Sequence, residues 1–217
     1  MIVSDVDHPL GMGSLWIDEK GVPEGLYWAG GVDIVVDGYA RVVFCVDLLT
    51  SVNVPGTYDT TMDFSDTPYI SPGNYSDVPS LKRVGWLLQN EWPSTALDGA
   101  ALQLAIWGII TDKGDGFGTA DAPAGIVSQS TDASHPTDSS VLAAAILYET
   151  ESAGMSSSFG IVYHNTTLDG VPVQTLMGPG TDDGGPSPAP EPATVLMIFG
   201  GLALIGVSRL RRSARTN

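Results

Sequence analysis

The sequence predicts an α+β domain, in which sandwich- or barrel-like strands carry a small helical subdomain, followed by a single hydrophobic helix at the C-terminus. Three observations indicate this order. Residues 32–48 form two β-rich runs, residues 81–152 hold three helix-like segments, and two further β-rich runs lie between 159 and 177. The last thirty or so residues differ in composition, which leaves about 180 for one domain with a sizeable core.

The clearest local signal is a hairpin formed by Val32–Val36 and Tyr39–Leu48. The two runs are separated by Asp37-Gly38, a dipeptide typical of the type I′ turn between antiparallel strands. Alternate residues of a strand point to opposite faces. The second run therefore has an apolar face that we expect to meet the core, made of Ala40, Val42, Phe44, Val46 and Leu48. Cys45 lies on the other, mixed face, and we expect it to point away from the main core, free to meet another subdomain.

Two helices are predicted in the middle of the chain, after a long Pro- and Ser-rich loop region at Thr50–Pro79 that has at most short strands. Leu81–Trp92 predicts a short helix that ends before a proline. Asp98–Thr111 predicts a stronger one, because its apolar residues repeat with helical spacing to form one stripe, made of Leu102, Ile106, Ile109 and Ile110. Gln103 and Trp107 share a neighbouring face, one turn apart.

The remaining segments complete the domain. Lys113–Gly125 is a Gly- and Asp-rich loop, and Ser139–Ser152 predicts a third helix, capped by Asp138 or its first residue. Phe159–Tyr163 and Val171–Met177 predict the closing strands.

Composition and charge limit the function. Hydrophobic residues make up 43% of the chain and charged residues 16%, which is typical of a globular protein. The chain has 25 acidic and nine basic residues, for a net charge of −16, and four of the basic residues lie in the C-terminal tail. So acidic a body repels phosphates, which excludes nucleic acid as a partner. The single cysteine rules out an internal disulfide.

The C-terminus has three successive parts. Residues 178–189 form a Gly/Pro/Ser/Asp linker after the domain at 1–177, and the tail at 190–217 begins with Pro190, Glu191 and Pro192. The apolar run Val195–Val207 is shorter than the ~20 residues of a permanent membrane span. A basic cluster follows it, as expected on the cytoplasmic side: Arg209, Arg211 and Arg212.

This order resembles the PEP-CTERM sorting signal of Gram-negative bacteria. The resemblance implies an exosortase-type transpeptidase as partner and a precursor held transiently in the inner membrane. After tail cleavage the protein would reach the cell surface or the exopolysaccharide matrix. The first residues, Met1–Pro9, have neither a basic n-region nor an apolar h-region. We therefore expect a start site assigned too late, or a chain given without its leader.

A second resemblance lies within the body. Phe44-Cys45-Val46-Asp47 on a strand, followed by Leu102-Gln103-Leu104-Ala105-Ile106-Trp107 on a helix, resembles the thioester domains of bacterial surface adhesins. Their signature is an aromatic-Cys-aliphatic strand and a later hydrophobic-Gln-x-Ala-Ile-Trp helix. Leu102 stands where Thr is common in the family. The resemblance implies an internal thioester between Cys45 and Gln103, shielded from water by Trp107 and Phe44.

Such a bond would capture a target amine or hydroxyl covalently, once per molecule, so the protein would not be an enzyme. The alternative is a passive exopolysaccharide-matrix protein whose Cys and Gln never react. A cysteine hydrolase is disfavoured, because His164 and Asn165 are adjacent in a strand and face opposite sides. No metal or other cofactor is predicted, although Asp112, Asp115 and Asp121 leave calcium open without its usual spacing.

Overall fold

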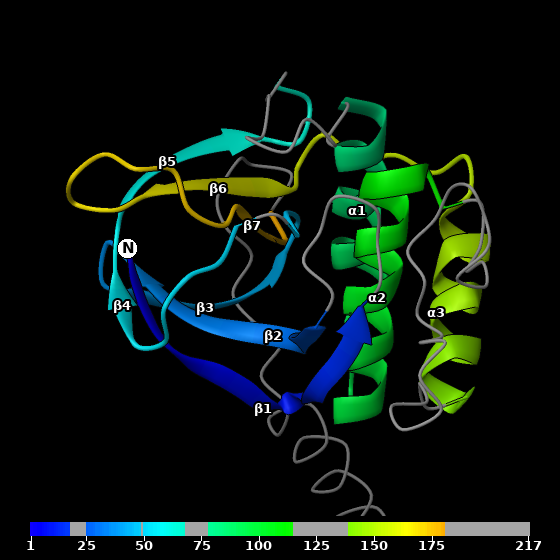
Figure 1. Ribbon diagram of the computed structural model, residues 1–217. Helices are drawn as coiled ribbons and strands as arrows, with labels where there is room; N and C mark the ends of the chain where they lie inside the picture. The colour runs from blue at the N-terminus through cyan, green and yellow to red at the C-terminus, as the bar shows by residue number, and fades with distance from the viewer. Residues whose placement is uncertain (18–24, 49, 68–77, 115–138, 181–217) are drawn as a thin grey trace, which may run out of the picture. The chain divides into compact units, whose positions relative to one another are not determined.

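The computed structural model describes residues 1–17, 25–48, 50–67, 78–114 and 139–180, and for 7–17, 25, 26 and 112 it describes the backbone alone. The chain divides into two compact units, Met1–Ser187 and Pro188–Asn217. Figure 1 shows the helices and strands of the first unit. The predicted linker beyond residue 180 and the whole sorting tail lie outside the described residues, including Pro190, Glu191, Pro192, Arg209, Arg211 and Arg212.

The predicted α+β class is confirmed, with strands before and after a group of helices. Within the described residues the elements are β1 (Ile2–Ile17), β2 (Gly25–Val36), β3 (Tyr39–Cys45), β4 (Gly56–Thr57), β5 (Asp59–Phe64), α1 (Val78–Asn90), α2 (Ala96–Asp112), α3 (Ser139–Ser152), β6 (Ile161–Thr166) and β7 (Leu176–Gly178).

The strands form one antiparallel sheet that curls into a nearly closed barrel, in the order β4-β1-β2-β3-β7-β6-β5. Its two outermost strands, β4 and β5, are separated along the chain by Tyr58 alone. Tyr58 N–H donates to Met1 O over 2.9 Å, and the Met1 amino group donates to Tyr58 O over 2.8 Å. The segment from β4 to β5 thus pairs with β1 at its first end and with β6 at its second end. This pairing leaves little open sheet edge.

The predicted hairpin is confirmed as β2 and β3, which pair from Val36–Tyr39 back to Val32–Val43. Asp37 has φ 51° and Gly38 has φ 84°, so both central residues are left-handed, as a type I′ turn requires. Strand β1 was not predicted; it pairs with β2 from Ile2–Val35 to Ile17–Gly25 through several irregularities. The predicted loop region at 50–79 contains the short strands β4 and β5.

The predicted helices are present. The third has the predicted bounds, and α1 begins three residues earlier than expected because Pro79 is tolerated in a first helical turn. Helix α2 lies between the barrel and α3 and is buried on every side from Ala100 to Ile109 (Figure 1). The predicted closing strands are shifted to Ile161–Thr166 and Leu176–Gly178, where they pair with β5 and β3.

Helix α2 separates two apolar clusters. The predicted stripe of Leu102, Ile106, Ile109 and Ile110 packs in one of them, together with α1. Its opposite side packs in the other, which fills the barrel end and includes Ala101, Leu104, Trp107 and Cys45. No helix in the described ranges combines the length and the apolar character needed to cross a bilayer.

The turn geometry makes Gly38 a sensitive position. We expect Gly38→Val to lower the free energy of unfolding by about 1–2 kcal/mol, because a β-branched residue at φ 84° is strained. Urea unfolding at neutral pH measures the loss. The matched control Asp37→Asn keeps a residue type that tolerates the left-handed region and should shift stability by less than about 0.5 kcal/mol. Equal losses from the two variants would contradict the type I′ assignment.

Candidate functional site

The two residues of the predicted thioester come from β3 and α2. Helix α2 begins after Thr95, whose side chain accepts a hydrogen bond from Asp98 N–H at 3.1 Å and so caps the helix. The helix ends at Lys113, which adopts φ 71° and donates its N–H to Ile109 O. With both ends held, two turns of helix bring Gln103 against the last residue of β3.

Gln103 and Cys45 are joined by two hydrogen bonds. Cys45 N–H donates to Gln103 Oε1 at 2.9 Å, and Gln103 Nε2 donates to Cys45 O at 2.8 Å. The side-chain amide thus pairs with one backbone residue of a strand, as a neighbouring strand would. The structure therefore brings together the two residues that sequence reasoning singled out, 58 positions apart.

The sheet explains why the backbone of Cys45 needs this partner. Strand β2 continues along β1, but its pairing with β3 stops at Val43. On the opposite edge, Val46 N–H donates to the carbonyl oxygen of Thr175, the residue before β7. Because successive residues of a strand point their polar groups to opposite edges, Cys45 faces the side that β2 has left. The amide of Gln103 fills that position in the ladder.

The pair is shut off from solvent. Gln103 is fully buried and Cys45 is 5% exposed. The expectation that Cys45 points away from the main core is wrong, since it packs in the larger cluster with Val43 and Trp107. The physical reason is that α2 covers the mixed face at the end of β3, so both faces of the strand are buried there.

Burial controls the chemistry of the thiol. Desolvation, with a smaller contribution from the charge of Asp47, raises the pKa of Cys45 from 9.0 to about 12. At pH 7 only on the order of one thiol in 10⁵ is ionised, against a few per cent for an exposed cysteine. The thiol therefore stays protonated unless a neighbouring group accepts its proton.

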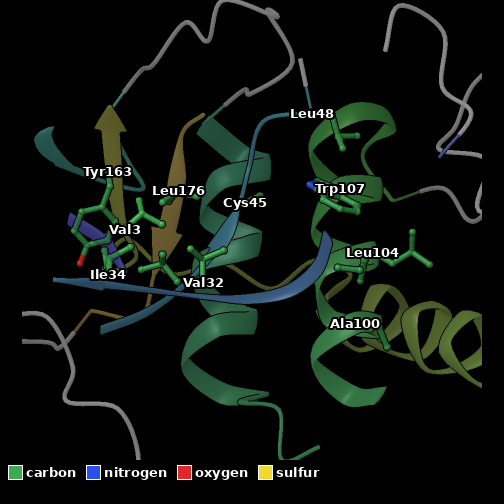
Figure 2. Packing of buried hydrophobic residues seen from close by; sticks show 14 of the residues in the cluster. Val3, Val32, Ile34, Cys45, Leu48, Ala100, Leu104, Trp107, Tyr163 and Leu176 are labelled. Atoms are coloured by element: carbon green, nitrogen blue, oxygen red, sulfur yellow. The ribbon is translucent and has the colours of Figure 1, made fainter. Parts of the chain in front are cut away.

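Trp107 lies one turn after Gln103 and in the same cluster as Cys45 (Figure 2). Its ring is 1% exposed and meets Tyr27 edge to face, with centroids 6.5 Å apart. The indole N–H has no hydrogen-bond partner among the described residues. A buried donor without an acceptor costs about 1–3 kcal/mol, so this group is available to a partner that arrives at the site.

Phe44, the second predicted shielding residue, is fully buried in the other cluster. It meets Trp92 edge to face at 6.0 Å. Because neighbouring strand residues point to opposite faces, its ring lies across β3 from the thiol. It packs within the other cluster, whereas Trp107 belongs to the same cluster as Cys45.

Asp47 is a residue of this region to which sequence reasoning gave no role. It is 2% exposed, its carboxylate accepts from Thr50 Oγ at 2.6 Å, and its backbone carbonyl accepts from Gln174 Nε2 at 2.9 Å. Asp47 is two residues after Cys45, so the alternation of strand side chains places both on the same face. That spacing could have indicated a role for Asp47 next to the thiol. Its negative charge disfavours the thiolate.

The other candidate groups lie elsewhere. His164 Nε2 is 3.3 Å from Asp63 Oδ2, and burial lowers its pKa although Asp63 opposes this. Asn165 is buried between Thr60 and Gln174, to which it is hydrogen-bonded. In the part of the chain that the structure describes, no three His, Cys, Asp or Glu residues gather as metal ligands. The side chain of Asp112, and Asp115 and Asp121, lie outside the described residues.

The pairing leads to a stability prediction. In a Cys45→Ala background, where no acyl bond contributes, Gln103→Leu should lower the free energy of unfolding by about 2–4 kcal/mol, because it leaves two buried backbone groups unpaired. Urea unfolding gives the value. The control Gln89→Leu removes an amide that donates to Gly180 O and accepts from Ser157 Oγ; because both bonds are only partly buried, it should cost about 1 kcal/mol. Equal losses in the free energy of unfolding from the two variants would show that the Gln103 amide does not complete the backbone pairing of Cys45.

The thiol leads to a pH prediction. The folded-state pKa lies above the unfolded value of 9.0, so the stabilising effect of the protonated thiol is complete below pH 9 and is lost as pH rises towards 12. We expect molecules with a free thiol to lose up to about 1.4 kcal/mol per pH unit above pH 9, relative to Cys45→Ala. Urea unfolding between pH 8 and 10, below most tyrosine ionisation, measures the difference. Parallel curves for the two proteins would contradict the buried-thiol geometry.

No protein-family model, curated protein or solved structure matches this chain. Any assignment of function therefore depends on the paired geometry of Cys45 and Gln103 and on the two sequence resemblances.

Proposed function

We propose that this is an exported cell-surface or matrix protein that holds an internal thioester between Cys45 and Gln103 and uses it to capture a target covalently. The observation that carries the proposal is the mutual hydrogen bonding of the two residues inside the core. An amide is a poor electrophile, and holding the two groups in contact can supply about 7–11 kcal/mol of the barrier.

The pairing also orients the reactants. Strand side chains stand roughly perpendicular to the plane in which the backbone forms its hydrogen bonds. We therefore expect the thiol of Cys45 to stand to one side of the plane that contains the Gln103 amide, the direction from which a nucleophile attacks a carbonyl carbon. Cys45 N–H already binds Oε1, the atom that becomes negative in the tetrahedral intermediate. One backbone donor thus polarises the amide and stabilises the charge that develops.

The reaction balances without any cofactor. The S–Cδ bond forms, the Cδ–Nε2 bond breaks, and the thiol proton leaves with Nε2 as ammonia. Direct transfer of this proton removes the need for a free thiolate, which the raised pKa of Cys45 makes scarce. In the capture step a target amine or hydroxyl attacks Cδ, its proton returns to sulfur, and Cys45 leaves as a thiol.

Protection from water is the second requirement of such a bond. Gln103 is fully buried, and the Trp107 and Tyr27 rings pack together beside it. Trp107 N–H, which has no acceptor among the described residues, can bind the acyl oxygen or the incoming nucleophile. Each molecule transfers its acyl group once, so the proposed activity is covalent binding and not enzymatic turnover.

Export is the second part of the proposal and is supported by the sequence of the tail. Pro190-Glu191-Pro192, the short apolar run and the arginines at 209, 211 and 212 have the order of a PEP-CTERM signal. The partner would be an exosortase-type transpeptidase. The precursor would be anchored transiently in the inner membrane, and the cleaved protein would lie at the surface or in the extracellular matrix.

One observation favours a passive matrix protein as the second candidate. The amide of Gln103 is already satisfied by the Cys45 backbone, and the thiol is buried and protonated. Both are what an unreactive core contact would show. The two candidates differ in whether Nε2 is still present in the purified protein.

Intact mass separates them. The full chain, purified in mild detergent, should be lighter than its sequence by one ammonia, and methylamine should convert the species to the sequence mass plus one methylene. Cys45→Ala and Gln103→Glu should each abolish the loss, whereas the control Gln174→Glu should retain it. Full sequence mass together with one titratable thiol after denaturation would rule out the thioester and leave the passive candidate.

A further inference from the structure

A pocket opens in the barrel wall away from the Cys45–Gln103 pair. Strand β7 pairs with β3 only at Phe44 and Cys45. Among the described strands, the first half of β3 therefore has β2 on one edge and none on the other. A pocket of about 490 Å³ lies there, within the range of about 300–1,000 Å³ typical of small-molecule sites. Its lining comes from the end of β2, the β2–β3 turn, and strands β3, β5 and β6, and includes Tyr39, Arg41, Met62, Asp63, Phe64 and Tyr163.

The floor of the pocket contains a polar group that the fold does not use. Tyr163 is 1% exposed, and its hydroxyl makes no hydrogen bond to a described residue. Arg41 is its cationic neighbour, and the guanidinium opposes the rise of the phenol pKa that burial causes. A buried hydroxyl without a partner destabilises the fold, and a ligand group that pairs with it recovers that loss.

The walls are apolar and partly aromatic, and unusually exposed for such residues. Tyr39 is 66% exposed, Met62 49% and Phe64 39%. The guanidinium of Arg41 lies 5.7 Å from the centre of the Tyr39 ring. The rim thus presents the Tyr39 ring, with the Arg41 guanidinium over one of its faces, next to the apolar side chains of β5.

The charges around the pocket select against an ionic ligand. Two carboxylates, Asp37 and Asp63, accompany the single guanidinium of Arg41. Asp63 is partly engaged by His164 Nε2 at 3.3 Å, and half of its side chain is exposed. An anion would be attracted by Arg41 but repelled by both carboxylates and by the acidic body. The polar lining is instead a mixture of donors and acceptors.

We propose that this pocket binds a neutral hexose unit of a polysaccharide. A sugar ring has an apolar C–H face, which fits the Tyr39, Met62 and Phe64 surface, and hydroxyl groups that both donate and accept. Those hydroxyls can accept from Arg41 and from the buried Tyr163 hydroxyl and donate to Asp63. The site does not depend on the thioester, so either proposal can fail without the other.

Binding to simple probes tests the pocket. The full chain in a detergent without a sugar headgroup is titrated with the methyl glycosides of glucose, galactose and mannose, and with methyl glucuronoside and phenylacetate as anionic probes. Side-chain Arg41 Nε and backbone amide NMR shifts report the binding. We expect saturable shifts at Arg41, Met62 and Phe64 with at least one neutral glycoside, and weaker binding of both anions. No saturable shift with any neutral glycoside, or tighter binding of an anion, would overturn the proposal.

Two variants locate the contact. Tyr163→Phe removes only a hydroxyl that the fold leaves unpaired, so it should keep the thermal midpoint and weaken the glycoside by about tenfold. Asp63→Asn changes a half-exposed side chain and should weaken glycoside binding several-fold. This variant tests the pocket even if Tyr163→Phe is unstable. The control Tyr148→Phe removes a hydroxyl from α3 and should change nothing. Unchanged affinity in both pocket variants would place the sugar elsewhere and overturn the assignment.

Discussion

The pairing of one side-chain amide with one backbone residue holds the fold together at its centre. Strand β2 leaves β3 after Val43, and without Gln103 the N–H and C=O of Cys45 would be buried with no partner. The amide closes the ladder from a helix, which fixes the position of α2 between two apolar clusters. The docking of α3 on α2, and the burial of Trp107 beside Cys45, both depend on that position.

The same contact can be structural or reactive, and the energies involved explain why. Two buried hydrogen bonds stabilise the amide where it is, and burial raises the pKa of the thiol, so neither group is reactive in isolation. What the pairing offers is proximity of the two residues and a hydrogen-bonded amide carbonyl in a buried site, and both features would lower the barrier of the proposed reaction. The site that we propose would react once and then protect its product, which suits a single-use bond better than turnover.

Local patterns were predictable from the sequence and long-range closure was not. The Asp37-Gly38 turn and the spacing of Leu102 and Ile106 depend on neighbours a few residues away, and both predictions are confirmed. Strand β1 lacks alternation because its pairing with β2 is irregular, and the pairing of Tyr58 with Met1 has no local signal. The burial of Cys45 escaped prediction because it depends on where α2 docks, whereas Asp47 lies on the same predicted strand face and could have been found from the alternation.

The central claim concerns two atoms, the sulfur of Cys45 and the amide carbon of Gln103, at a junction where a helix completes a strand ladder. A high-resolution crystal structure of the purified protein tests it most directly. The account predicts continuous electron density between these atoms, with Oε1 still bound to Cys45 N–H and no nitrogen left on the side chain. An intact amide still donating to Cys45 O, beside a separate thiol, would contradict it.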